Sequence, residues 1–341
     1  MARIRKNKKL NRIGITGVGK DLPDYVLTNA ELEKLVDTND EWITTRTGIK
    51  TRRINKIHQE AASDYGARAA KKALKDAGLA AKHVDLIIVA TITPDMQFPS
   101  TACLIQAKIC AIKAVCFDVS AACAGYLYAI SIANSFLSSG MYRNALVIGT
   151  EILSSITDWE DRSTCVLFGD GAGAAVLEPV KKGGILSALL GSDGTAADIL
   201  KVPAGGSLLP ATHQTLKGRL HFIKMHGADV FKHAVRTMSH SVQQILDECG
   251  LKLEDITCLI PHQANIRIID ALIQRLGLDK AKVFINVDKY GNMSSASSAV
   301  ALCEAAQKGR IKKGEILVQV AFGAGLTWGA TVVEWTRRNS I

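Results

Sequence analysis

The sequence predicts an α/β protein built from two similar halves. Helical and strand patterns alternate along most of the 341 residues, and such alternation is typical of βαβ units. In addition, two pairs of distant segments resemble each other, which indicates an internal duplication. We place the two halves at residues 1–182 and 183–341.

The clearest repeat pairs LKDAGLAAKHVDLII at residues 74–88 with LDECGLKLEDITCLI at residues 246–260. In each copy a helix ends on a glycine, Gly78 or Gly250, which can take the left-handed cap conformation, and a buried strand follows. A second pair, GAAVLE at 173–178 and GATVVE at 329–334, follows a glycine-rich segment in both copies. The two pairs are spaced differently, so we expect different insertions in the two halves.

The patterns define the elements of each half. The first half is expected to contain helices over 61–77 and 124–138 and strands over 84–90, 114–119 and 145–150. The second half is expected to contain helices over 228–249, 265–276 and 295–308 and strands over 256–261, 315–321 and 330–335. We expect largely parallel sheets related by a pseudo-twofold axis, with a site at the carboxyl ends of the strands.

Composition places the protein among cytoplasmic globular proteins. Hydrophobic residues make up 48% of the chain, enough for a large core, yet no apolar run of about 18 residues could cross a membrane. The basic segment 1–12 lacks the apolar stretch of a secretory signal. Most of the eight cysteines lie among apolar residues without C-x-x-C spacing, which favours reduced thiols and no metal site.

The net charge of +10 favours acidic partners. Aromatic residues are only 5% of the chain, and no basic stretch is interleaved with Phe or Tyr. Stacking surfaces for single-stranded nucleic acid are therefore not predicted, and we expect no nucleic-acid binding.

Cys123 lies where a strand is predicted to become a helix, in AVCFDVSAACAGYLYAI at residues 114–130. The N-terminus of a helix favours a thiolate, so we expect a lowered pKa for this cysteine. The small residues around it leave room for a substrate. From this junction alone, a nucleophile and a core residue are equally acceptable interpretations.

Two polar residues of the second half could complete a site with Cys123. His262 follows the repeated strand directly, and its counterpart in the first half is Ala90. Asn292 precedes the helix that Ser294 and Ser295 are expected to cap. Each has a simpler interpretation as a packing histidine or a turn asparagine. Together with a cysteine they suggest either a papain-like protease, whose cysteine signature is absent, or acyl transfer between thioesters.

Several motifs in order resemble β-ketoacyl-acyl carrier protein synthase III, the initiating condensing enzyme of type II fatty acid synthesis. The resemblance extends over nearly the whole chain and is carried by DEWITTRTGI (40–49), FPS (98–100), DVSAACAGYLYA (118–129), FGDGAGA (168–174), PHQANIRI (261–268), YGNMSSAS (290–297) and FGAGLTWG (322–329). It implies a thiolase-like fold with stacked mixed sheets in an α/β/α/β/α arrangement.

The resemblance also implies a reaction and its residues. Cys123 would take an acyl group from acyl-CoA, and decarboxylation of malonyl-acyl carrier protein would then give a carbanion that attacks the acyl-cysteine. His262 and Asn292 would donate hydrogen bonds to the enolate, and the backbone N–H groups of Cys123 and Ala324 would hold the acyl oxygen. Ala324 stands where the family commonly has glycine. CoA thioesters are substrates here, and no cofactor is implied.

Further residues match the family's binding surfaces. Trp42 and Arg162 would enclose the adenine of CoA, with Arg46 and Asn265 also in contact with CoA. Lys232 and Arg267 would face the acidic carrier protein. Phe98 and Leu153 would shape the acyl pocket, Phe98 by reaching into the partner subunit of a homodimer.

Related families fit less well. Degradative thiolases have a second catalytic cysteine in the C-terminal glycine-rich segment, and residues 322–329 contain none. Elongating condensing enzymes have a second histidine in place of Asn292. The glycines in GITGVGK and FGDGAGA lack the spacing of nucleotide-binding loops. A related synthase of secondary metabolism, of the alkylquinolone or polyketide type, and a non-catalytic module that binds carrier protein remain as alternatives.

Overall fold

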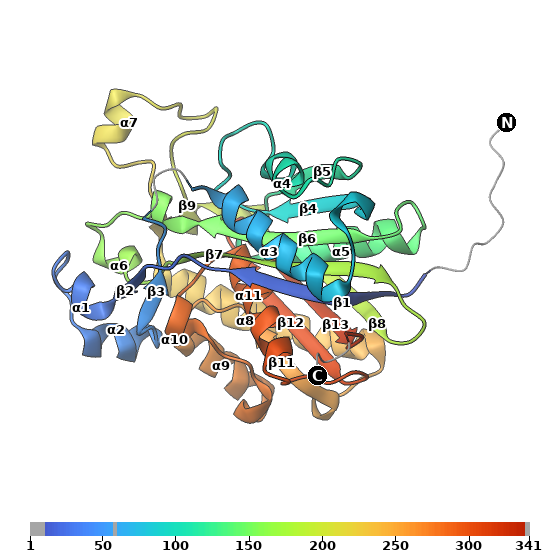
Figure 1. The fold of residues 1–341 in the computed structure, drawn as a ribbon. Coiled ribbons are helices and arrows are strands. Elements are labelled where there is room, and N and C mark those ends of the chain that lie inside the picture. The colour runs from blue at the N-terminus through green and yellow to red at the C-terminus, as the bar shows by residue number, and fades with distance from the viewer. Residues whose placement is uncertain (1–10, 57–59, 338–341) are drawn as a thin grey trace.

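The computed structural model describes residues 11–56 and 60–337, in which helices and sheets form alternating layers (Figure 1). Two sheets are stacked with helices between them and on both outer faces. Most of the basic segment 1–12 lies outside the described residues. The layered arrangement is the one that the sequence motifs implied.

The first sheet has five strands, all from the first half of the chain. β4 pairs in parallel with both β5 and β6, whereas β7 runs antiparallel to β6 and β1. In spatial order the strands are β1 (Ile13–Asp21), β7 (Asp170–Pro179), β6 (Ala145–Ile152), β4 (Leu86–Ala90) and β5 (Val115–Val119).

The second sheet has four strands, in which β11 corresponds to β4 and β13 corresponds to β7 by the sequence repeats. They are β11 (Ile256–Pro261), β12 (Ile316–Gly323), β13 (Thr327–Glu334) and β8 (Gly184–Ser192). Only β11 and β12 are parallel, so the expectation of largely parallel sheets was wrong for this half. The reason is local, because only a short turn joins β12 to β13 and antiparallel pairing results. The division predicted at residues 182 and 183 lies in the turn before β8 and stays a prediction.

Two helices fill the space between the sheets, and other helices cover the outer faces. α5 (Gly125–Ser138) and α11 (Ser295–Gln307) are the inner helices, and α11 is buried along almost its whole length. Glycines in the first sheet allow this close packing, since a Cβ on Gly173 would come within 2.5 Å of the backbone of Ala299. The outer helices are α3 (Ala62–Ala77) and α4 (Thr101–Ile109) on one side and α8 (Gly227–Cys249) and α9 (Ile266–Leu276) on the other.

Every helix and strand predicted from the sequence is present, with ends that differ by a few residues. The predicted glycine caps are confirmed, since Gly78 and Gly250 end α3 and α8 with φ of 70° and 65°. Smaller elements that the patterns did not reveal are β2 (Val26–Thr28), β3 (Thr51–Arg53), β9 (Leu200–Lys201), β10 (Lys224–Met225), α1 (Asn29–Leu32), α2 (Asp40–Thr47), α6 (Arg162–Cys165), α7 (His213–Lys217) and α10 (Val287–Tyr290).

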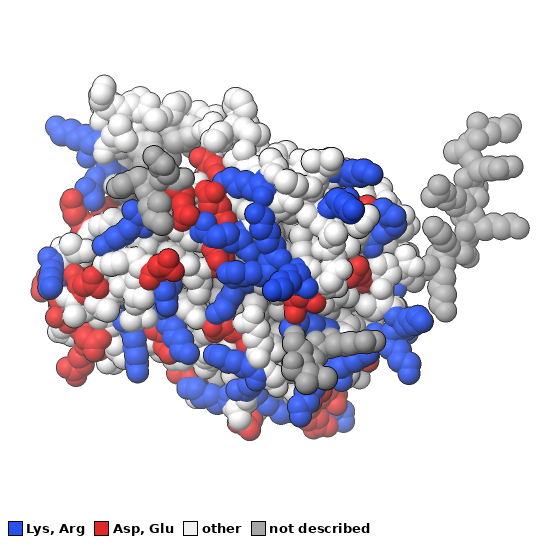
Figure 2. All heavy atoms as spheres, in the orientation of Figure 1, with Lys and Arg blue, Asp and Glu red and all other residues white. Residues whose placement is uncertain are grey.

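The surface and the cysteines agree in part with the composition. Lys and Arg side chains gather over the middle of one face, where α3 lies (Figures 1 and 2). All eight cysteines are free, but Cys110 is exposed rather than packed in the core. Within residues 11–56 and 60–337, no helix is both long enough and apolar enough to cross a membrane.

Candidate active site

A cavity of about 960 Å³ lies where the two halves of the molecule meet. Cys123 from the first half and His262 and Asn292 from the second half all line it. Its walls are largely apolar, with Ile92, Leu153, Ile156, Leu167, Phe168, Ile223, Met225, Val230, Phe231, Met238 and Phe322 among the lining residues. The three polar residues that the sequence singled out therefore converge on one space.

Cys123 lies in a single turn of 3₁₀ helix, η2 (Ala122–Ala124), between β5 and α5. Gly323 packs directly against it, because a Cβ on that glycine would come within 2.6 Å of the Cys123 backbone nitrogen. Burial raises the pKa of the Cys123 thiol to about 12, although the nearby Ser294 hydroxyl lowers it somewhat. The expected lowering of this pKa by the helix N-terminus was therefore wrong, because burial outweighs it and the sulfur is a neutral thiol.

His262 follows the last residue of β11, and its side chain is buried. Its backbone N–H donates to the carbonyl oxygen of Val320 at 2.8 Å, which fixes the residue to the neighbouring strand β12. Burial lowers the pKa of His262 to about 4, so the imidazole is neutral at physiological pH. The Nδ1 atom is buried without a hydrogen-bond partner among the described residues.

Asn292 lies between α10 and α11 and is held by the first half of the chain. Its backbone N–H donates to the Leu167 carbonyl at 2.9 Å, and its own carbonyl accepts from Gly169 at 3.0 Å. The side-chain oxygen accepts from the Ser294 amide at 2.8 Å. Because the oxygen is occupied in this turn, the side-chain NH₂ group remains to donate elsewhere.

The residue before Asn292 must be a glycine. Gly291 has φ of 63°, and a Cβ there would come within 2.6 Å of the Leu167 carbonyl oxygen. The GN pair, which alone suggests an ordinary turn, is therefore needed for close contact between the halves.

Ala324 lines the same cavity in the turn between β12 and β13. Thr327 is the first residue of β13, and its hydroxyl donates to the Ala121 carbonyl oxygen at 2.9 Å. This contact ties the turn to the segment that carries Cys123.

Of the three residues expected to bind the adenine end of CoA, Arg46 is among the residues that line the cavity, and Trp42 and Arg162 are not. The guanidinium carbon of Arg162 is 4.9 Å from the centre of the Trp42 ring, and that of Arg46 is 5.8 Å away. Arg162 also donates to the carbonyl of Asp37 at 2.8 Å. The stacking partners are thus brought together, but Arg162 covers the ring directly and leaves no room for a base between them.

The other predicted contacts lie on the helices around the opening. Lys232 on α8 is exposed, and Arg267 on α9 lies 5.9 Å from the Phe231 ring; both line the mouth. Asn265 also lines the cavity, and its side-chain oxygen caps α9 by accepting from the Ile268 amide at 3.0 Å. Asn265 therefore has a structural role as the N-cap of α9, in addition to its predicted contact with CoA.

The two residues predicted for the acyl pocket lie apart within one chain. Leu153 lines the cavity and is buried. Phe98 is not among the lining residues and is 83% exposed. The structure of a single chain therefore places only Leu153 in the pocket.

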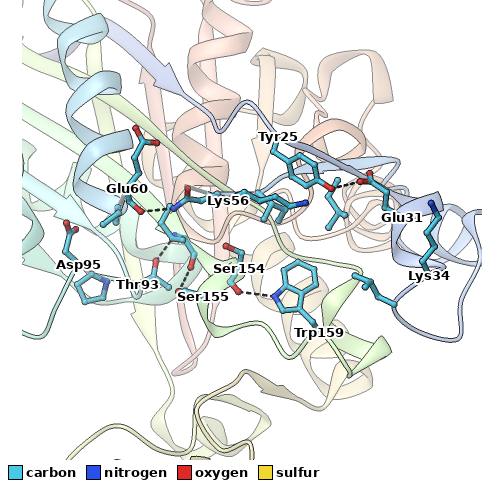
Figure 3. A pocket seen from close by; sticks show the side chains of 18 residues that line it. Tyr25, Glu31, Lys34, Lys56, Glu60, Thr93, Asp95, Ser154, Ser155 and Trp159 are labelled. Carbon is cyan, nitrogen blue, oxygen red and sulfur yellow. Dashed lines mark hydrogen bonds between the residues drawn. The ribbon is translucent and has the colours of Figure 1, made fainter. Parts of the chain in front are cut away.

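A second cavity of about 960 Å³ lies in the first half, between residues 25–35, 54–56, 60–62, 93–95 and 152–159 (Figure 3). Several of its polar groups already have hydrogen-bond partners. The Tyr25 hydroxyl donates to Glu31, and the Trp159 indole donates to the Ser154 carbonyl at 3.3 Å. Neither cysteine nor histidine is among its lining residues, so the first cavity is the better candidate for acyl chemistry.

Comparison with known proteins agrees with this geometry. The family model for the C-terminal part of 3-oxoacyl-[acyl-carrier-protein] synthase III matches residues 246–335, and the model for 3-oxoacyl-[acyl-carrier-protein] synthase III matches residues 117–194. The β-ketoacyl-[acyl-carrier-protein] synthase III of Caldanaerobacter subterraneus subsp. tengcongensis is 57% identical over 325 residues, which are 95% of this chain and 98% of the relative.

Solved structures give the same result. The 3-oxoacyl-[acyl-carrier-protein] synthase III of Aquifex aeolicus is 48% identical, with a TM-score of 0.88 over 95% of this chain and 100% of that one. The priming β-ketosynthase of the R1128 polyketide pathway is 35% identical, with a TM-score of 0.90 over 97% and 98% of the two chains. The chain therefore belongs to the β-ketoacyl-acyl carrier protein synthase III family, the acyltransferases that initiate fatty acid synthesis by condensing an acyl-CoA with malonyl-acyl carrier protein.

Proposed function

We propose that Cys123, His262 and Asn292 carry out this condensation in the cavity between the halves. The observation that supports the proposal is the convergence of a cysteine, a neutral buried imidazole and a carboxamide from both halves on one largely apolar space. The purified protein, mixed with acetyl-CoA or longer and branched acyl-CoA primers and malonyl-carrier protein, should yield 3-ketoacyl-carrier protein detectable by mass spectrometry. Absence of product with every primer would contradict the proposal.

In the first half-reaction the Cys123 sulfur attacks the thioester carbonyl of acyl-CoA. The cysteine loses its proton, the CoA sulfur gains one as it leaves, and one thioester replaces another. The thiol is neutral at rest, so the reaction depends on stabilising the oxyanion that forms at the carbonyl. The backbone N–H groups of Cys123 and Ala324 are proposed to donate to that oxygen. Because backbone groups donate, an alanine at position 324 is compatible with this role.

In the second half-reaction malonyl-carrier protein loses carbon dioxide, and negative charge develops on its thioester oxygen. The Asn292 NH₂ group and the neutral His262 imidazole are proposed to donate hydrogen bonds there. The resulting carbanion attacks the acyl-cysteine carbonyl, and the Cys123 sulfur leaves. A low pKa suits His262 to this task because a neutral ring stays in place as a donor without adding a buried charge.

Acyl-CoA is proposed to enter past Trp42, Arg46 and Arg162. The indole and the two guanidinium groups offer flat surfaces and positive charge for an adenine and phosphates. Since Arg162 covers Trp42 in this structure, binding of adenine between them requires the arginine to move. Crystals soaked with CoA should show that shift, and adenine bound away from Trp42 would overturn this part of the proposal.

The carrier protein is proposed to dock on the basic side chains Lys232 and Arg267. Replacing both with Glu should raise the KM for malonyl-carrier protein on the order of tenfold at low salt, because charges at the edge of an interface steer an acidic partner. Acylation of Cys123 by acyl-CoA, followed by intact mass, should change little. The double variant Lys71→Glu/Lys75→Glu on α3, at two exposed sites and with the same total charge change, is the control. An equal rise in KM for the control would contradict a local docking site.

A homodimer is proposed to complete the acyl pocket. Phe98 is 83% exposed, and β5, which forms an edge of the first sheet, begins with the exposed Val115. An exposed edge strand and an exposed large apolar side chain are both suited to association. Sedimentation equilibrium should give twice the chain mass, and Val115→Lys should weaken the dimer. A fully active monomer would refute the role of Phe98.

We also propose that the protein acts in the cytoplasm, where its free cysteines stay reduced. Recovery of the protein from an exported fraction would contradict this proposal.

A further inference from the structure

Glu151 is a fully buried carboxyl group that the reaction described above does not use. It lies near the end of β6, in the otherwise apolar or small run ALVIGTEI, and its side chain has no solvent exposure. It is close enough to Cys123 to affect the pKa of that thiol. An acidic group in such a place requires either compensating partners or a proton.

One carboxyl oxygen is surrounded by donors from the end of β4. Glu151 Oε2 accepts from the Thr93 hydroxyl at 2.7 Å, from the Ile92 amide at 3.1 Å and from the Thr91 hydroxyl at 3.3 Å. The Thr93 hydroxyl in turn accepts from the Ile152 amide at 2.8 Å, so its own hydrogen is free to point at Glu151. This oxygen behaves as a pure acceptor.

The other oxygen faces a hydroxyl group that already has an acceptor. Glu151 Oε1 lies 2.8 Å from the Ser295 Oγ and accepts a longer contact from the Ser295 amide at 3.4 Å, and that Oγ lies 2.9 Å from the carbonyl oxygen of Ala90. Ser295 supplies one hydrogen, and the carbonyl supplies none. A second hydrogen, carried on Oε1, allows both contacts to be full hydrogen bonds: Glu151 donates to Ser295, and Ser295 donates to Ala90.

We propose that Glu151 is a protonated positioning residue, whose neutral acid donates to Ser295 and thereby fixes the start of α11 and the Asn292 side chain next to it. The path is short. The Asn292 side-chain oxygen accepts from the Ser294 amide, and Ser295 is the following residue and the first of α11. Glu151 and Cys123 belong to the first half of the chain, and Ser295 and Asn292 belong to the second half. The contact between Glu151 and Ser295 therefore positions the Asn292 side chain relative to Cys123.

Two further observations fit a neutral acid. Burial raises the pKa of Glu151, as expected for a carboxyl without a cationic partner among its contacts. In addition, burial already raises the pKa of Cys123, and a negative Glu151 would raise it further. A proton on Glu151 removes its negative charge, and with it the additional increase in the pKa of Cys123, whose sulfur is the proposed nucleophile.

Infrared difference spectroscopy tests the proton without reference to activity. The spectrum of the protein minus that of Glu151→Gln, recorded at pH 8, should show a protonated carboxyl C=O band and no carboxylate bands. Carboxylate bands in that difference would overturn the protonation state. This result stands or falls independently of the proposed roles of His262 and Asn292.

Substitutions test the positioning role, which rests on the proposed function. Gln reproduces the neutral acid, since its NH₂ can donate to Ser295 and its oxygen can accept from β4. Glu151→Gln should lower malonyl decarboxylation less than threefold, whereas Glu151→Asp, which withdraws the group from Ser295, should lower it at least tenfold. Acylation of Cys123 should fall much less in Glu151→Asp. A tenfold loss of decarboxylation in Glu151→Gln, or equal loss of both half-reactions in Glu151→Asp, would overturn the role.

Asp170 provides a matched control, because it is a buried carboxyl with only donors around it. Its oxygens accept from the Asn55 amide at 2.7 Å and from the Ser154 amide and hydroxyl at 2.9 and 2.6 Å. Burial raises the pKa of Asp170 to about 6, so it is ionised at pH 8. Asp170→Asn would place an NH₂ group against a donor and should lower the Tm by several degrees, while Glu151→Gln should leave the Tm nearly unchanged. A similar fall in both variants would show that Glu151 is ionised as well.

Discussion

Replacing Cys123 with Ala is expected to abolish acylation by acyl-CoA. The sulfur is the proposed acyl acceptor, and Cys123 is the one cysteine among the residues that line the cavity. Intact mass spectrometry after incubation with acetyl-CoA should show one acyl group per chain of the unmodified protein and none on Cys123→Ala. Cys123→Ser should acylate at least a thousandfold more slowly, because a hydroxyl is a far weaker nucleophile than a thiol near neutral pH.

The exposed Cys110 provides the control for this experiment. It lies at the end of α4 and is the cysteine that reagents reach most easily. Cys110→Ser should therefore retain the full acyl adduct. If Cys123→Ala still gained an acyl group that Cys110→Ser lost, the label would be adventitious and the proposed nucleophile would be wrong.

The sequence predicted the frame of this site well because the frame depends on local patterns. Glycine caps at Gly78 and Gly250 and apolar strands such as 256–261 are determined by neighbouring residues, and each was found. His262 was identified because a polar residue follows a buried strand. The duplication then suggested that the halves face each other, and the cavity lies between them.

The features that the sequence did not predict depend on distant contacts. The protonation of Cys123 was misjudged because the helix N-terminus is visible in the sequence, whereas the burial that raises its pKa comes from packing of the other half, such as Gly323. The antiparallel pairs of the second sheet follow from one short turn. Glu151 was missed, although a single acidic residue within the strand ALVIGTEI was a usable signal.

Replacing His262 or Asn292 with Ala is expected to slow malonyl decarboxylation by a hundredfold to a thousandfold. Each side chain is proposed to donate one hydrogen bond to the developing enolate, and loss of one such donor costs about 3 kcal/mol in comparable sites. Acylation of Cys123 is proposed to rely on the backbone donors of Cys123 and Ala324, so its rate should fall less than tenfold. Release of carbon dioxide from malonyl-carrier protein and the mass of the acyl-enzyme measure the two half-reactions separately.

Asn292→Asp distinguishes donation from shape in this experiment. The aspartate has nearly the same size as the asparagine but replaces the NH₂ donor with an acceptor that carries negative charge at neutral pH. Decarboxylation by Asn292→Asp should therefore be at least as slow as by Asn292→Ala, because an anion next to the enolate opposes its formation. If the aspartate variant kept near-normal decarboxylation, or if the alanine variants lost both half-reactions equally, His262 and Asn292 would not be the enolate donors.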